Sequence, residues 1–117
     1  DSVFVFDCWN GEVVKRDPPA NFERTVSKSN NDWLTVKATG GLDITGDFAE
    51  VDYTIAGIRY GSTTEYKYTI RSKLWSLITI EKLLNHVGFT QVTALSWMEP
   101  NIVAAPDSWK IILTAHS

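Results

Sequence analysis

The chain has 117 residues, of which 44% are hydrophobic and 21% charged, so it is long enough for one ordinary hydrophobic core and is not disordered, collagen-like or coiled-coil. The net charge of −3 and the isoelectric point near 5.2 argue against nucleic acid as a partner. No apolar run reaches the roughly 20 residues that span a bilayer, so we expect no membrane partner. Cys8 is the single cysteine, and no cluster of His and Cys is present, so we expect no disulfide, no metal site and a reducing, cytoplasmic location.

The first element is the apolar run VFVF at residues 3–6. Both faces of such a strand are apolar, which is typical of a strand covered on both sides in a parallel sheet. The following Asp7 to Gly11 is predicted to leave the strand, since Gly11 permits a sharp bend. The segment KRDPPANF at 15–22 has two adjacent prolines and is predicted to be an extended loop.

Residues 22–73 change to a period of two. AEVDYTI at 49–55 and EYKYTIR at 65–71 alternate apolar and polar residues, which predicts half-buried antiparallel strands. FERTVSKS at 22–29 and WLTVKAT at 33–39 are weaker strand candidates. Turn residues at 30–32, 40–41 and 61–62 separate these runs, so we expect about four hairpin-connected strands. DITGD at 43–47 has part of a calcium-loop pattern, but the acidic twelfth position is missing, and a turn is predicted.

One helix and two strands follow. Thr79 is a candidate N-cap, and apolar residues at 80, 83, 84 and 87 form one stripe that ends at Gly88. QVTALSWM at 91–98 and WKIILTA at 109–115 are predicted strands, joined by a loop around residues 100–107. His116, two residues from the end, is expected to be frayed.

This order of elements resembles the C-terminal half of class I S-adenosylmethionine-dependent methyltransferases. VFVFDCWNG resembles the fifth strand of that fold and the loop that leaves it, ITIEKLLNHVGF its last helix, and DSWKIILTA its final antiparallel strand. The antiparallel sheet between them is similar to that of the small-molecule N-methyltransferases. The resemblance implies an α+β fold over 1–117 as a single domain: a remnant of an α/β methyltransferase sheet, made of strands 5, 7 and 6 and the last helix, with an antiparallel sheet inserted at 22–73. Within that sheet, residues 3–6 would run parallel to 91–98, with 109–115 antiparallel between them.

The resemblance also implies a function for the parent enzyme, which is transfer of a methyl group from S-adenosylmethionine to a small-molecule acceptor. The family binds this cofactor with a glycine-rich turn after its first strand and an acidic residue at the end of its second. Neither is present here: TGGLD at 39–43 lies among antiparallel strand signals and is not followed by a helix pattern. We therefore expect the chain to begin at strand five, to lack the cofactor motif and to be inactive alone, with no cofactor bound.

Asp7, Trp9 and Asn10 lie, by resemblance, in the loop that faces the substrate, and they are the candidate substrate-binding residues. The plainer interpretation is that Asp7 and Asn10 cap a turn while Trp9 packs. The sequence does not identify catalytic residues. Cys8 is expected to be a packed thiol.

Two alternatives remain open. The chain is either a stand-alone module that holds an apolar ligand or partner on its tyrosine-rich antiparallel sheet, or an unrelated α+β domain. Under the methyltransferase interpretation, Val3–Phe6 would form an unprotected sheet edge, and one sheet face would be bare. We therefore expect a homodimer, through the strand edge or through a sheet face.

Overall fold

The structure is a computed structural model that describes residues 1–117, apart from the side chain of Pro100. The chain divides into two compact units. The terminal unit comprises Asp1–Asp17 and Leu74–Ser117, and the hairpin unit comprises Pro18–Lys73. The elements in chain order are β1 (Val3–Trp9), α1 (Gly11–Arg16), β2 (Phe22–Ser29), β3 (Asp32–Leu42), β4 (Phe48–Arg59), β5 (Ser62–Lys73), α2 (Leu77–His86), β6 (Gln91–Ser96), β7 (Glu99–Val103) and β8 (Lys110–His116).

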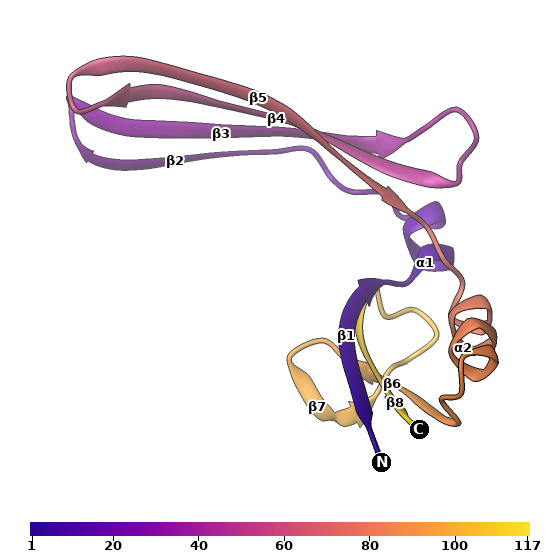
Figure 1. Cartoon of the computed structure of the whole chain (residues 1–117). Coiled ribbons are helices and arrows are strands. Elements are labelled where there is room, and N and C mark those ends of the chain that lie inside the picture. The colour runs from indigo at the N-terminus through magenta and orange to yellow at the C-terminus, as the bar shows by residue number, and fades with distance from the viewer. The chain divides into compact units, whose positions relative to one another are not determined.

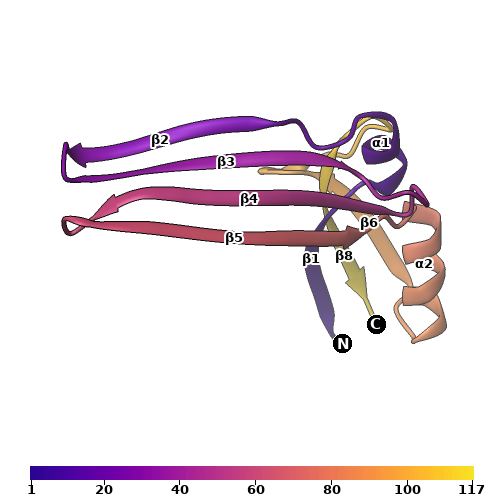
Figure 2. The same cartoon turned by 90° about the horizontal axis from the view of Figure 1, so that it is seen from above.

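The terminal unit contains a four-stranded sheet in the order β1-β8-β6-β7, with α2 beside it (Figures 1 and 2). β8 pairs antiparallel with both β1 and β6, so β1 and β6 run in the same direction on either side of it. This confirms the predicted arrangement of the three strands. Taken with the second, wholly antiparallel sheet and two helices, the fold is α+β, as expected.

The core of the terminal unit lies on one face of this sheet. Ile111, Leu113 and Ala115 of β8 are at most 2% exposed, and alternation along the strand places them on the same face. The helices contribute the buried Val14 and Leu84, and Phe89 after α2 contacts the ring of Phe4 at 5.9 Å between centroids. The other face carries more exposed side chains.

β1 corrects two predictions. It is the edge strand, as the methyltransferase interpretation predicted for Val3–Phe6. Val3, Phe4 and Val5 are 46–59% exposed, so the burial on both faces that the apolar pattern predicted is wrong for this chain. The strand also continues to Trp9, because ladder pairing with β8 holds its backbone extended through the Trp9–Lys110 pair. Asp7 and Trp9 therefore lie on a strand and not in the predicted loop.

The segment after β1 forms a short helix where the sequence predicted a loop. α1 buries Val13 and Val14, and the backbone oxygen of Asn10 accepts a hydrogen bond from the Val14 amide. Gly11 begins the helix against the backbone of Trp75, and its amide donates to the Trp75 carbonyl at 3.1 Å. The helix ends at Arg16, shortly before Pro18 and Pro19, which cannot continue it.

Smaller corrections follow from pairing and capping. Ser76, not Thr79, caps α2, because the Ser76 hydroxyl accepts a hydrogen bond from the Thr79 amide at 3.2 Å. Gly88 ends the helix as predicted, with a φ of +105°. Of the predicted stripe only Leu84 is buried. β7 replaces the first part of the predicted 100–107 loop, and His116 is not frayed, because it pairs within β8.

The hairpin unit is a four-stranded antiparallel sheet in the order β2-β3-β4-β5 (Figure 2). The predicted hairpin-connected strands are confirmed. The glycines at 40–41 lie inside β3 and not in a turn. The 43–47 segment is the predicted turn: Asp43 accepts hydrogen bonds from the Thr45 hydroxyl at 2.8 Å and the Phe48 amide at 3.3 Å.

Candidate functional site

The carboxyl ends of β1 and β6 lie at one edge of the sheet in the terminal unit. Ligands of sheets with parallel strands bind outside such carboxyl ends, so this edge is where chemistry is expected. β8 runs in the opposite direction, so its first residues reach the same edge. Three tryptophans meet the sheet here, one at the end of β1, one just after β6 and one just before β8. We define the aromatic edge as Trp9, Trp97 and Trp109 together with Asp7 and Lys110.

The contacts within the aromatic edge combine stacking with charge. The rings of Trp9 and Trp109 have centroids 4.5 Å apart. The Lys110 ammonium lies 3.8 Å from the centroid of the Trp97 ring and 3.2 Å from the Asp7 carboxylate. The Lys110 ammonium thus makes a cation–π contact with the Trp97 ring and an ion pair with the Asp7 carboxylate.

The indole of Trp109 also anchors α1. Its Nε1 donates a hydrogen bond to the Asp17 carbonyl at 2.8 Å, just after the last turn of that helix. The Trp109 carbonyl accepts from the Asn10 amide at 2.8 Å. One residue thus holds both ends of α1, and the helix is fixed relative to the edge.

The three predicted substrate-binding residues have different surroundings. The Asp7 side chain is 50% exposed, Trp9 is half-buried, and Asn10 is 4% exposed. Asn10 is therefore a buried residue of the turn between β1 and α1. It occupies the N-cap position, but its side chain makes no capping hydrogen bond to the helix. Asp7 pairs with Lys110 and Trp9 packs on Trp109, and the role of both residues in substrate binding stays a prediction.

The sequence analysis missed Trp97, Trp109 and Lys110. They lie about 90 to 100 residues from Asp7 and Trp9, and only the antiparallel return of β8 brings them to this edge. A weak signal was present, because both of the last two predicted strands carry tryptophan at the end that adjoins the loop between them.

Cys8 lies next to Asp7 in β1 and pairs with Ile111. Burial raises the pKa of its thiol above the ordinary value, and the negative charge of Asp7 raises it further. A higher pKa lowers the fraction of the nucleophilic thiolate. The half-buried, unpaired Cys8 is consistent with the packed thiol that the sequence predicted.

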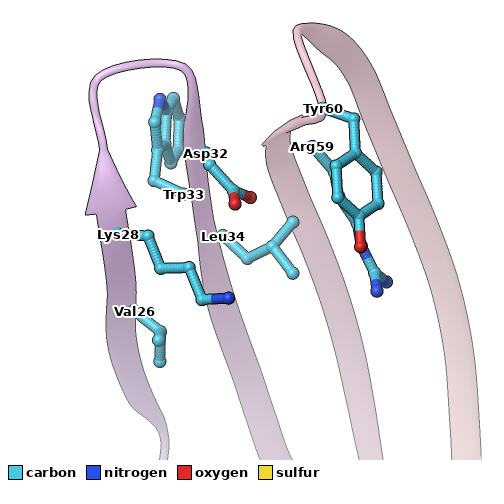
Figure 3. Close-up of a pocket in the computed structure, with 7 residues that line it drawn as sticks. All are labelled: Val26, Lys28, Asp32, Trp33, Leu34, Arg59 and Tyr60. Atoms are coloured by element: carbon cyan, nitrogen blue, oxygen red, sulfur yellow. The ribbon is translucent and has the colours of Figure 1, made fainter.

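A hollow lies in the hairpin unit, beside the turns that join β2 to β3 and β4 to β5 (Figure 3). Its volume is about 270 Å³. It combines two cations and one carboxylate with aromatic and aliphatic side chains, and its lining residues are Val26, Lys28, Asp32, Trp33, Leu34, Arg59 and Tyr60. Tyr60 has a φ of +53°, so the hollow includes a residue in the left-handed region.

The part of the chain that the structure describes includes no group of three or more His, Cys, Asp or Glu side chains that could hold a metal ion. Within the same residues, no helix is long and apolar enough to cross a bilayer.

Comparison with known proteins gives matches in structure alone. No protein-family model matches the chain, and no curated protein sequence matches it. An S-adenosylmethionine-dependent methyltransferase from Clostridium acetobutylicum is similar over 97% of this chain, with a TM-score of 0.74 and 11% identity. The CcbJ methyltransferase from Streptomyces caelestis is similar over 99% of this chain, with a TM-score of 0.63 and 13% identity.

The chain spans less than half the length of either structure, 44% and 46% respectively. At this level of identity the similarity establishes a shared fold. The expected resemblance to the methyltransferase fold is confirmed to that extent.

Proposed function

We propose that this chain forms the C-terminal part of an S-adenosylmethionine-dependent methyltransferase for a small-molecule acceptor, and that the aromatic edge forms part of the acceptor wall. The observation that carries the proposal is the strand order, in which β8 returns antiparallel between β1 and β6. The similarity to two methyltransferase structures over nearly the whole chain supports it.

The residues of this chain do not fit the cofactor. The turn from β1 into α1 contains Gly11, but the Trp75 backbone already lies against this glycine and accepts its amide hydrogen bond. A Cβ at Gly11 would lie 2.5 Å from the Trp75 carbonyl oxygen, and the Gly11 amide already donates to that oxygen. The carboxylate of the cofactor therefore finds no free amide at Gly11, and in this proposal the cofactor site belongs to another part of the enzyme.

The aromatic edge suits a flat organic acceptor that carries an amine. Methyl transfer depends mainly on holding the acceptor atom in line with the donor, and stacking surfaces restrict a small molecule effectively. Trp9 and Trp97 offer aromatic faces, and the Asp7 carboxylate offers a partner for an amine. In this proposal the neutral amine of the acceptor donates an N–H hydrogen bond to Asp7 in place of Lys110, and the Trp faces orient it. Its lone pair then takes the methyl group from the sulfonium, and the Asp7 carboxylate accepts the proton that the amine loses.

The proposal is tested in the longest reading frame that encodes this segment. We expect that protein to bind S-adenosylmethionine in calorimetry and to transfer a labelled methyl group to a small amine or hydroxyl compound, whereas the 117-residue chain shows no binding at millimolar cofactor. Asp7→Asn and Trp9→Ala should raise the acceptor KM and leave the cofactor Kd unchanged. Lys82→Ala, an exposed change on α2, is the control. Saturable cofactor binding by the 117-residue chain would contradict the assignment.

A second candidate function has one observation in its favour. Tyr66 and Tyr68 of β5 are 62% and 45% exposed, and Tyr68 stacks on Tyr53 with centroids 4.9 Å apart. Such a surface suits a stand-alone module that holds an apolar ligand or partner. A reading frame that starts immediately before Asp1, together with ligand-induced changes in tyrosine fluorescence, would favour this candidate over the enzyme.

A further inference from the structure

The hollow at the turns of the hairpin unit shares no residue with the aromatic edge, and its floor is apolar. Val26 of β2 and Leu34 of β3 pair across the ladder, so their side chains point to the same side of the sheet. Gly57 of β4 pairs with Leu34 and adds no side chain beside it. A Cβ at Gly57 would collide with the Trp33 carbonyl oxygen, so the two backbones leave no room for a larger residue. The hollow therefore stays open beside Leu34.

Two cations flank this floor. Lys28 lies at a β-bulge, because the pairing register of β2 shifts between Ser27 and Ser29, and a bulge re-aims a side chain. Arg59 ends β4, and Figure 3 shows Leu34 between the Lys28 and Arg59 side chains. Among the residues that the structure describes, no carboxylate forms an ion pair with either cation. Both charges are therefore available to an anionic ligand.

An aromatic side chain closes the hollow at the turn between β4 and β5. Tyr60 and Gly61 have φ values of +53° and +77° and form the two-residue turn between the paired Arg59 and Ser62. Turns of this kind favour Asn, Asp or Gly, so a tyrosine with positive φ is held there at a cost in free energy. The centroid of its ring lies 5.3 Å from the Arg59 guanidinium carbon. The Gly61 amide donates to the Asn31 carbonyl at 3.4 Å, which joins this turn to the turn between β2 and β3.

We propose that this hollow binds a small aromatic carboxylate. Its lining holds Lys28, Arg59 and one carboxylate, Asp32, so it has one net positive charge, which matches the single charge of such a ligand. That charge is opposite in sign to the net charge of −3 of the whole chain. The proposal goes beyond the methyl-transfer function and does not depend on it.

Each part of the lining has a counterpart in such a ligand. The Arg59 guanidinium can donate two parallel hydrogen bonds to a carboxylate, and the Lys28 ammonium adds a second positive charge. The aromatic ring of the ligand packs on the aliphatic floor, and Trp33 and Tyr60 offer aromatic faces to it. The volume of about 270 Å³ corresponds to roughly nine water molecules, which is room for a single ring with its carboxylate.

The test uses benzoate as the probe and the whole 117-residue chain as the receptor. Binding is followed by nitrogen–proton correlation NMR at the indole signal of Trp33, which the variant Trp33→Phe identifies. A ligand of this size should bind with a Kd of roughly 1 mM. Benzamide has the same shape without the charge, and its Kd should be roughly tenfold higher or more. Benzylamine, a cation, should not shift the signal.

Charge variants locate the site. Arg59→Gln and Lys28→Gln should each raise the benzoate Kd roughly three- to tenfold, because each removes one cation from the lining. Asp32→Asn should lower the Kd, because it removes the carboxylate that repels the ligand, and a gain in affinity cannot come from unfolding. The matched control is Lys37→Gln, which removes an exposed cation from the opposite face of β3 and should leave the Kd unchanged.

Three results would overturn the proposal. The first is a Trp33 signal that benzoate does not shift at tens of millimolar. The second is a benzamide Kd equal to that of benzoate, which would mean that the cations do not bind the ligand. The third is an Asp32→Asn variant whose Kd is not lowered, or a loss on Lys28→Gln and Arg59→Gln no larger than that on Lys37→Gln, since the anion would then bind elsewhere.

Discussion

Two adjacent glycines in β3 offer a direct test of how the hairpin unit is packed. A Cβ added at Gly40 would lie 2.8 Å from Pro19 Cβ and closer still to the Pro19 carbonyl oxygen. The Gly40 amide donates to the Asn21 side-chain oxygen at 2.9 Å, so the segment from Pro19 to Asn21 lies tightly on this position. A Cβ added at Gly41 meets nothing within 4 Å.

The magnitude follows from these contacts. Gly40→Ala forces the Pro19 segment away, which costs about 1–3 kcal/mol for overpacking. Loss of the hydrogen bond that the Gly40 amide donates to Asn21 adds about 1 kcal/mol. The smaller entropy of alanine in the unfolded chain returns about 0.5–1 kcal/mol, so the free energy of unfolding should fall by about 1–3 kcal/mol. Gly41→Ala gains the same entropy without a clash and should raise it by about 0.5 kcal/mol.

Urea unfolding followed by far-ultraviolet circular dichroism measures both variants. With a denaturant slope of about 2 kcal/mol/M, the midpoint of Gly40→Ala should fall below that of Gly41→Ala by about 1 M or more. Equal midpoints would refute the argument, because they would mean that the Pro19 segment does not rest on β3.

Three further results are expected. Ser76→Ala removes the hydroxyl that caps α2 and should lower the free energy of unfolding of the terminal unit by about 1 kcal/mol, measured by urea unfolding. Desolvation acts to raise the pKa of Asp43, but hydrogen bonds from Thr45, Arg71 and the Phe48 amide and the charge of Arg71 lower it below its ordinary value. The stability that this carboxylate contributes is therefore present above the unfolded pKa and is lost as the pH falls through the lower folded pKa. The urea midpoint of the wild type should thus exceed that of Asp43→Asn at neutral pH, and the difference should vanish on acidification. A difference that stays constant with pH would contradict this. Asp7→Asn removes one of the two causes that raise the Cys8 pKa, so iodoacetamide should alkylate the thiol faster than in wild type at about pH 8, and an unchanged rate would contradict the effect of the Asp7 charge.

The local patterns of the sequence determined most elements of the hairpin unit. The period-two runs around Tyr53 and Tyr68 predict strands because alternation of apolar and polar residues suits a pleated backbone with one wetter face. The turn at 43–47 was also predictable, because Asp43 and Thr45 bond to backbone and side-chain groups within five residues. In the terminal unit the apolar periodicity near Leu84 and the stop at Gly88 predicted α2 for the same reason, since these signals act within a few residues.

Tertiary structure alone decided which apolar residues are buried. Val3, Phe4 and Val5 have the composition of a central strand, but their exposure depends on the strand order, which puts β1 at the edge. Ile111 has a similar composition and is fully buried, because β8 lies between two partners. Burial of a hydrophobic side chain is favourable in free energy, but the arrangement of the strands determines whether a neighbouring strand or helix covers it.

The candidate site needed the fold in the same way. Asp7 and Trp9 were identifiable near the end of the first strand, but Trp97, Trp109 and Lys110 come from the other end of the chain. Their contacts depend on the register of β8 against β1 and on the parallel direction of β1 and β6. Short-range patterns fix the type of each element, because they act through neighbours along the backbone. The site depends on long-range pairing, because stacking and ion pairs act between side chains that only the folded sheet brings within a few ångströms.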